Sequence, residues 1–443
     1  MVRERELWWL NPAYVAGIMG VLLALAAFFI PESMYRTYWF TPKYFDATAL
    51  RMWLACVGMF TCGAMAGAFR RLYSARHSDS EWAERVPWTF LHRVFNACFY
   101  LSLLGYVAWA AAAISRGATL ELALGVVHGD KGASIVMKEV YLGTISGITT
   151  LTQLAIVCLL LAVFIGIRDG WWRVIPKCGI LLLLTVIRAL LNSERLAVIE
   201  LLLPAAVLFA RLVILDSPRF RGRLWNILRA APALGYSALI VIFGASEYFR
   251  SWTNYYSGGD MSFWGFVSNR LLGYYVTALN NGALLAQRID PTGAPFFTFH
   301  LLWRFRMLSG IVDLLYPNLA LAANDTDPYM RYLTVEANPE FNNGSGFLVP
   351  VMDFGFVGAL LYWLLAGIVC GVLYRLFQQK RMTGLLFYPV VFVGAIELTR
   401  IIYWAEGRVF VPLCVLAMVA FVCRSYARRY RFSEGAAGWQ PSH

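Results

Sequence analysis

Residues 338–377 read NPEFNNGSGFLVPVMDFGFVGALLYWLLAGIVCGVLYRLF, and this stretch decides the fold class. A polar run passes directly into a long apolar segment, 346–377, which carries one acid, Asp353, near its start. A simple crossing of a bilayer needs only ~20 apolar residues. The stretch therefore predicts a transmembrane helix whose start is irregular or tilted, because Pro350 and the pair Gly344 and Gly346 favour an irregular entry.

The rest of the chain has the same apolar character. Of the 443 residues, 59% are hydrophobic and 14% are charged, whereas soluble domains carry roughly 25% charged residues. This composition excludes a soluble globular protein and predicts an all-α polytopic membrane protein with a single integral-membrane domain, 1–443. We expect about ten transmembrane helices, at 13–30, 49–69, 94–114, 150–167, 176–192, 195–215, 231–247, 346–377, 384–402 and 409–424.

The distribution of basic residues predicts the orientation. More than half of the Lys and Arg residues lie in short segments between alternate spans. The positive-inside rule places these segments in the cytoplasm, together with both termini and a tail at 425–443. The net charge of +12 therefore reflects membrane topology and does not indicate nucleic-acid binding. The longest outer segment, 248–345, exceeds an ordinary connection, so we expect a large periplasmic loop that contains short helices.

Within this loop, 263–288 reads as a helix. Five of its residues are spaced so that they share one face: Phe266, Arg270, Tyr274, Thr277 and Asn281. One interpretation is the partly solvated face of an interfacial helix. The other is a face that offers a cation, a phenol and an amide to an anionic, sugar-bearing ligand.

Charged residues also lie near the outer ends of the spans. Arg195 follows a short turn before the sixth span, and Arg408 opens the tenth. Glu397 and Arg400 are three residues apart, so they form either a helical ion pair or part of a site. Arginine is the side chain best suited to hold phosphate oxygens, because its planar guanidinium binds them in bidentate fashion.

Other motifs carry no chemistry. The DFG at 353–355 lacks the accompanying motifs of a kinase, and the DTD at 325–327 lies in a turn-forming context. Gly63 and Gly67 are four residues apart and predict close helix packing. The eight cysteines and five histidines show no metal-ligand spacing, so we expect no metal and no cofactor.

Five loose motifs resemble those of the Wzy-type O-antigen or oligosaccharide repeat-unit polymerases of bacterial envelopes. They are GTISGITTLTQL (143–154), NSERLAVIELLLP (192–204), NRLLGYYVTALNNG (269–282), FNNGSGFLVPVMDFGFVG (341–358) and LTRIIYWAEGRVF (398–410). The ten expected spans and the large late outer loop are also similar, and the resemblance covers most of the chain.

The resemblance implies an enzyme at the periplasmic face of the inner membrane that joins repeat units carried on undecaprenyl diphosphate. It implies neither a metal nor a nucleotide-sugar, and it adds a flippase and a chain-length regulator as partners, beside membrane lipids. Arginines would stabilise the lipid diphosphate leaving group: Arg195, Arg270, Arg400 and Arg408. A carboxylate would act as base: Asp353, Glu397, Glu406 or Glu336. Five residues would bind the glycan: Tyr274, Asn281, Asn342, Asn343 and Ser345.

Three alternatives remain. An O-antigen ligase, which transfers glycan from undecaprenyl diphosphate to another acceptor, would have a similar architecture. A lipid-linked glycan transporter would not be an enzyme, but such proteins often show two related halves with paired broken helices, and none is visible. A glycosyltransferase that uses polyprenyl-phosphate sugars would place two acids in the first outer loop, where Glu32 and Asp46 are far apart.

Overall fold

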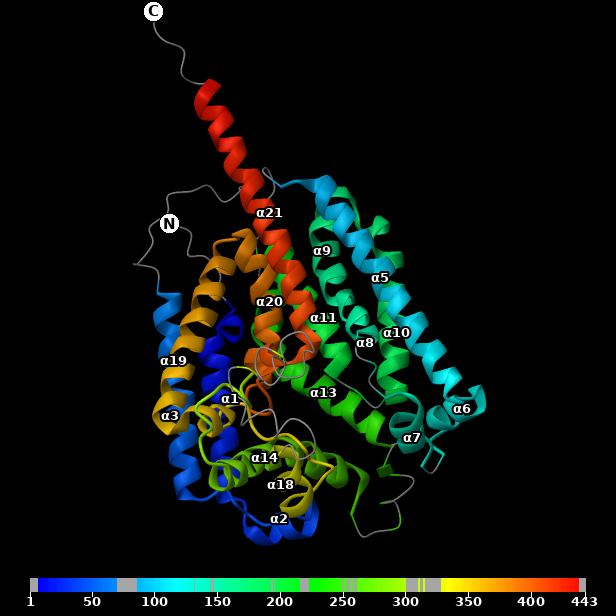
Figure 1. The fold of residues 1–443 in the computed structure, drawn as a ribbon, viewed down its shortest axis with the longest axis vertical. Helices are drawn as coiled ribbons and strands as arrows, with labels where there is room; N and C mark the ends of the chain where they lie inside the picture. Colours follow the sequence, from blue (N-terminus) through cyan, green and yellow to red (C-terminus); the bar gives the residue numbers. More distant parts are fainter. Residues whose placement is uncertain are drawn as a thin grey trace, which may run out of the picture.

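The computed structural model is all-helical and describes most of the chain. The described residues are 7–69, 86–130, 132–143, 145, 147–192, 194, 196–215, 223–248, 251–252, 256, 258, 261–299, 310, 314 and 328–437. Within them no strand occurs. Most of the helices form an elongated bundle, and a smaller group of helices covers one of its ends (Figure 1).

Eight helical segments in this part of the chain are long and apolar enough to cross a membrane, as expected of a multi-pass membrane protein. They are α1 (Pro12–Phe29), α3 (Ala47–Ala68), α5 (Trp88–Ser115), α8 with α9 (Ile148–Thr152 and Leu154–Asp169), α10 (Ile175–Asn192), α11 with η5 (Leu196–Phe209 and Ala210–Ile214), α19 (Val349–Gln378) and α21 (Gly407–Ala437). The seventh and ninth expected spans coincide with shorter apolar helices, α13 (Ala231–Glu247) and α20 (Met382–Glu397). A count of ten therefore stays a prediction.

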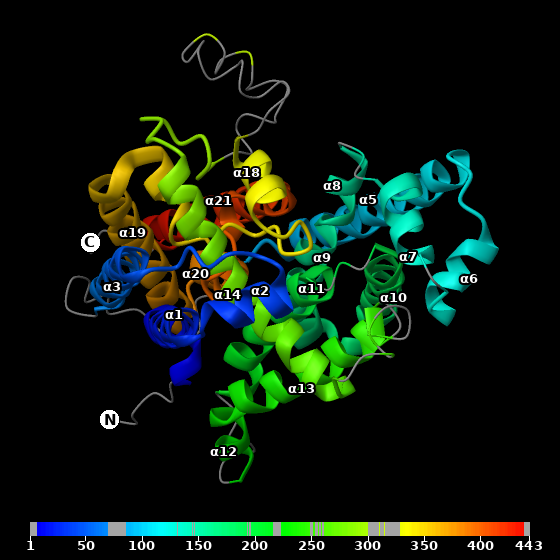
Figure 2. The same cartoon turned by 90° about the horizontal axis from the view of Figure 1, so that it is seen from below.

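The two ends of the bundle differ. At one end the start of α1 meets α20, because the Tyr388 hydroxyl donates to the carbonyl oxygen of Leu10. The other end, here called the loop end, carries α2 (Glu32–Trp39), α14 (Phe263–Arg288) and α18 (Pro328–Glu336). Figure 2 views the molecule from the loop end, with α14 lying across it. Other short helices among the described residues are η1 (Trp8–Leu10), η4 (Trp171–Arg173), α12 (Arg223–Arg229) and η8 (Tyr403–Ala405), and a group of three follows α5: α6 (Leu120–His128), α7 (Ala133–Val136) and η3 (Met137–Tyr141).

Two hydrophobic cores hold the bundle together. One is formed mainly by α5, α9, α11, α20 and α21, and the other by α1, α3, α14 and α19. In the second core, α3 and α19 approach so closely that their backbones touch. A Cβ added at Gly63 would collide with the backbone of α19, and one added at Gly367 would collide with the backbone of α3. Helix packing at Gly63 and Gly67 is thus confirmed, and Gly367 and Gly371 complement it from the partner helix.

The irregular start of the long span is confirmed, but the break lies neither at Pro350 nor at Gly344 and Gly346. Pro350 lies in the first turn of α19, where a backbone N–H has no partner within the helix. The break falls at Gly355, whose φ of 67° and ψ of 178° are readily adopted only by glycine. Two carbonyl groups before the break accept hydrogen bonds from the segment after α14, Met352 from Thr292 N at 3.0 Å and Asp353 from Gly293 N at 2.8 Å.

The last helix, α21, is longer than the predicted tenth span. It continues beyond residue 424 to Ala437 and so includes the first part of the segment predicted as a tail. In Figure 1 this end of α21 projects well beyond the rest of the bundle. The first part of the 425–443 segment is therefore a helical extension of the last span.

Candidate functional site

The predicted helix of the large loop is present with the expected bounds. α14 runs from Phe263 to Arg288, and the Ser262 side chain caps it by accepting from Gly265 N. The loop is thus not built from short helices alone, because this helix has 26 residues.

The predicted shared face of α14 packs against residues 340–343. Asn281 Nδ2 donates to the carbonyl oxygens of Phe341 (2.5 Å) and Asn343 (3.0 Å). The Tyr274 ring lies 5.1 Å from that of Phe341, measured between centroids. The face is therefore largely covered by protein. Its role is to hold the segment that contains Asn342 and Asn343.

Arg270 lies between two carboxylates. Its Nη1 is 2.5 Å from Glu340 Oε2, and its Nε is 3.4 Å from Glu247 Oε2. The side chain is buried, which by itself would lower the pKa of the guanidinium. The charges of Glu247 and Glu340 outweigh burial and raise the pKa of Arg270 above its usual value. Arg270 is therefore a permanent cation at the loop end.

A second arginine comes close to the first from a distant part of the sequence. Arg400 follows α20, and its Nη1 is 3.0 Å from Glu397 Oε2, so the expected ion pair is present. The guanidinium of Arg400 lies 5.8 Å from the centre of the Tyr274 ring, and that of Arg270 lies 5.9 Å from the same ring. Tyr274 thus lies near both cations, and its ring contributes favourable cation–π contacts.

A partly open pocket of about 290 Å³ lies beside Arg400. Asn342 and Asn343 line it, as do Glu406 and Tyr329. The Nε of Arg400 is buried and has no hydrogen-bond partner among the described residues. The pocket thus combines a cation, a carboxylate, two amides and an aromatic ring, so it offers both charged and hydrogen-bonding groups to a ligand.

Asp353 lies behind one wall of this pocket. Its carboxylate is fully buried and accepts hydrogen bonds from the backbone N–H groups of Phe297 (2.9 Å) and Thr298 (2.6 Å). Thr292 Oγ1 is 3.3 Å from the same carboxylate. Phe297 and Thr298 both line the pocket. This geometry favours an anchoring role for Asp353, in which it fixes the pocket wall to the broken helix.

Two further sequence-predicted residues lie apart from the pocket lining. Ser345 is fully buried and has a φ of 70°. Its Cβ packs so closely against Gly282 that a Cβ added to this glycine would collide with it, so Ser345 has a packing role. Glu336 forms an ion pair with the exposed Arg288, in which Glu336 Oε2 lies 2.7 Å from Arg288 Nη2.

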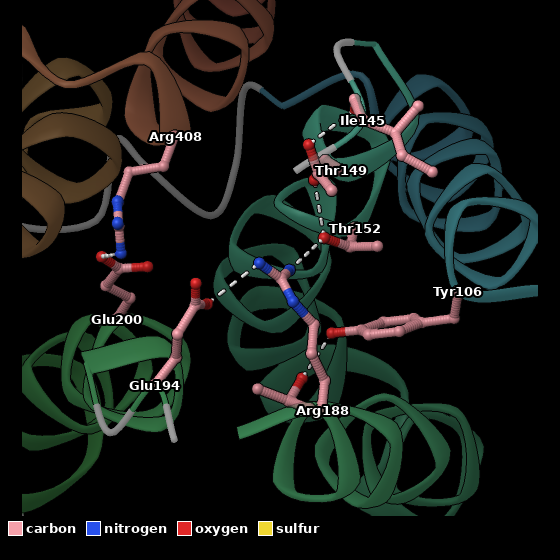
Figure 3. A network of polar contacts seen from close by, with 9 residues as sticks. Tyr106, Ile145, Thr149, Thr152, Arg188, Glu194, Glu200 and Arg408 are labelled. Carbon is pink, nitrogen blue, oxygen red and sulfur yellow. Dashed lines mark hydrogen bonds and ion pairs between the residues drawn. The ribbon is translucent and has the colours of Figure 1, made fainter. Parts of the chain in front are cut away.

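Arg408 belongs to a neighbouring polar group. Its Nη1 is 3.2 Å from Oε1 of Glu200, whose side chain is fully buried on α11. Figure 3 shows this pair beside a second network around Arg188, which is buried in α10. Arg188 donates to Thr152 Oγ1 at 2.6 Å and to Glu194 Oε2 at 3.1 Å. Both arginines are therefore tied to neighbouring helices.

The remaining predicted arginine, Arg195, lies outside the described residues. Sequence reasoning did not assign a partner to Arg408 or Arg270. An isolated acid in an apolar span, such as Glu200, could have indicated a buried pair. Nothing in the local sequence indicated that Tyr329 and Phe297 would line a pocket.

Comparison of the chain with protein-family models, curated protein sequences and solved structures gives no match.

Proposed function

We propose that this protein is a lipid-linked glycan polymerase that joins oligosaccharide repeat units carried on undecaprenyl diphosphate. The loop end would face the periplasm of a bacterial cell, with both termini in the cytoplasm. The resemblance of the five sequence motifs supports this assignment. The observation that carries it is the pocket beside Arg400, because predicted site residues from two distant parts of the sequence meet there: Arg400 from one, and the neighbouring Asn342 and Asn343 from the other.

The arginines would serve the leaving group. Cleavage of the bond between the anomeric carbon and the phosphate oxygen gives a lipid diphosphate with growing negative charge. Arg400 lines the pocket, and Arg270 lies near the same Tyr274 ring as Arg400. Cations held in fixed positions stabilise this charge more in the transition state than in the ground state. Loss of one such donor typically costs about 10²–10³ in rate.

Of the four carboxylates considered as the base, Glu406 has the best position. It lines the pocket beside Arg400. Asp353, Glu397 and Glu336 are not among the residues that line the pocket, and Asp353 and Glu397 are buried. We therefore assign Glu406 as the base.

The reaction then balances as a single transfer. The acceptor hydroxyl oxygen forms a bond with the anomeric carbon of the growing glycan, while the carbon–oxygen bond to the diphosphate breaks. The electron pair leaves with the lipid diphosphate, and the hydroxyl proton moves to the Glu406 carboxylate. Asn342 and Asn343 would bind sugar hydroxyls with their amides. A flippase and a chain-length regulator are the proposed partners.

The test is reconstitution of the full chain in lipid with undecaprenyl-diphosphate repeat units, followed by gel analysis of glycan length. Arg400→Ala should reduce elongation about 10²–10³-fold, and Glu406→Gln about 10²–10⁴-fold. Glu336→Gln is the matched control, because it makes the same change at an acid outside the pocket lining, and it should elongate normally.

Three outcomes would contradict the proposal. Normal elongation by Glu406→Gln would exclude Glu406 as the base. Transfer of glycan to a lipid A-core acceptor without elongation would identify a ligase. Movement of the lipid-linked unit across the membrane without any transfer product would identify a transporter.

A further inference from the structure

A helical hairpin outside the bundle has no role in the proposed transfer reaction. It comprises α6 (Leu120–His128), α7 (Ala133–Val136) and η3 (Met137–Tyr141). In both overall views it lies beyond the end of α5, on the side of the molecule away from α3 and α19 (Figures 1 and 2). A small core that includes Trp109 and Met137 attaches it to α5.

The outer face of this hairpin is apolar. Leu120, Leu124 and Val127 are spaced by four and three residues, so they form one strip along α6. Val136 and Val140 extend the apolar surface on the second arm. All five side chains are exposed, from 40% for Val136 to 77% for Leu120. Soluble surfaces rarely expose so many large apolar side chains together.

The position of the hairpin limits what can cover this strip. α6 begins five residues after α5 ends at Ser115, so its start lies within about 17 Å of the end of that span. The chain then returns to α8 at Ile148, which opens the next span. Both ends of the hairpin are thus tied to the membrane boundary. With 9 residues, α6 is far too short to cross a bilayer.

The span that leads into the hairpin also exposes large apolar side chains. Leu104, Val107 and Ile114 of α5 are exposed, as expected for a span that faces lipid. On the hairpin, Lys138 and Glu139 are exposed beside the apolar residues. An apolar strip bordered by charged side chains is the pattern of a helix that lies in a membrane interface.

We propose that the α6–η3 hairpin is an interfacial anchor. Its apolar strip is buried at the boundary between headgroups and acyl chains, in the leaflet at the loop end. The anchor fixes the depth of α5 and of the segment leading into α8. It depends on the membrane spans alone and does not require the polymerase assignment.

Nitroxide labels on single cysteines test the anchor in the full chain reconstituted in nanodiscs. The background replaces the two exposed native cysteines, Cys62 and Cys414, with serine, since the others are buried or half-buried. Labels replace Leu124, Val127 and Val136 in turn. Leu104→Cys is the lipid-facing control, and Glu139→Cys is the aqueous control.

Collision rates with oxygen, which partitions into lipid, and with a water-soluble nickel chelate then report the surroundings of each label. We expect the oxygen-to-nickel ratio at all three test sites to exceed that at Glu139→Cys several-fold and to approach that at Leu104→Cys. Nickel-accessible labels would show that the strip faces water. Labels shielded from both probes would show that protein, such as a second copy of the chain, covers it. Either result would overturn the proposal.

Discussion

At the scale of single residues, Asp353 shows how a charge can act through the backbone. Its carboxylate accepts hydrogen bonds from two backbone N–H groups in a segment that lies more than fifty positions earlier in the chain. Those two residues, Phe297 and Thr298, line the pocket. The acid that begins the long span therefore shapes the site without facing it.

Replacing Asp353 with asparagine should destabilise the protein. The amide offers one oxygen where the carboxylate offers two, so one buried N–H loses its acceptor at a cost of about 1–3 kcal/mol. Thermal unfolding in detergent should show a lower midpoint than for the wild type. Asp290→Asn makes the same change at an exposed acid in the segment after α14 and should leave the midpoint unchanged. Equal midpoints for both variants would refute the anchoring role.

Arg408 and Glu200 give a second prediction at this scale. Removal of the arginine leaves the carboxylate of Glu200 buried without its ion-pair partner, which typically costs about 3–5 kcal/mol. Arg408→Met should therefore destabilise strongly, and the double variant with Glu200→Gln should recover most of the loss. The thermal unfolding midpoints of the single and the double variant measure the loss and its recovery. If the double variant is no more stable than the single one, the pair does not act as a unit.

At the scale of helices, the contact between α3 and α19 depends on glycine from both sides. A Cβ at Gly63 would meet the backbone of α19, which cannot move aside as a side chain can. Overpacking of this kind costs about 1–3 kcal/mol.

The helix contact can be tested with two substitutions on α3. Gly63→Ala should lower the unfolding midpoint, because the added methyl group separates the two helices. At Gly58, on the same helix, a Cβ would meet no atom within 4 Å. Gly58→Ala should therefore be neutral or slightly stabilising, since alanine favours helix more than glycine does. A smaller effect at Gly63 than at Gly58 would show that the contact tolerates separation.

The position of α14 could be predicted from the sequence, whereas the pocket could not. Helical spacing located α14 correctly, because its apolar and polar positions follow the 3.6-residue period. The sequence also indicated Asn342, Asn343 and Arg400. It could not indicate that they share a pocket, because that depends on how α14 and the link after α20 pack. Nor could it reveal the partners of Asp353, since backbone N–H groups are present at almost every residue.

At the scale of the whole molecule, we expect the two ends of the bundle to face opposite sides of the membrane. Cysteines at Arg288 and Glu121, which lie toward the loop end, should react with a membrane-impermeant maleimide in intact cells. A cysteine at Arg429, on the extension of α21, should react only after the membrane is permeabilised. Labelling of position 429 in intact cells would contradict the predicted orientation and the even number of spans.

The pairing of α3 with α19 also affects biosynthesis. Most of the chain separates the two helices, and ribosomes add about 5–20 residues per second. After α3 enters the membrane, its glycine-lined face must therefore wait on the order of tens of seconds for its partner. During that time the N-terminal spans can associate with other newly made helices. Substitutions on this face should therefore reduce the yield of correctly assembled protein. They should have less effect on the catalytic rate of the molecules that do assemble.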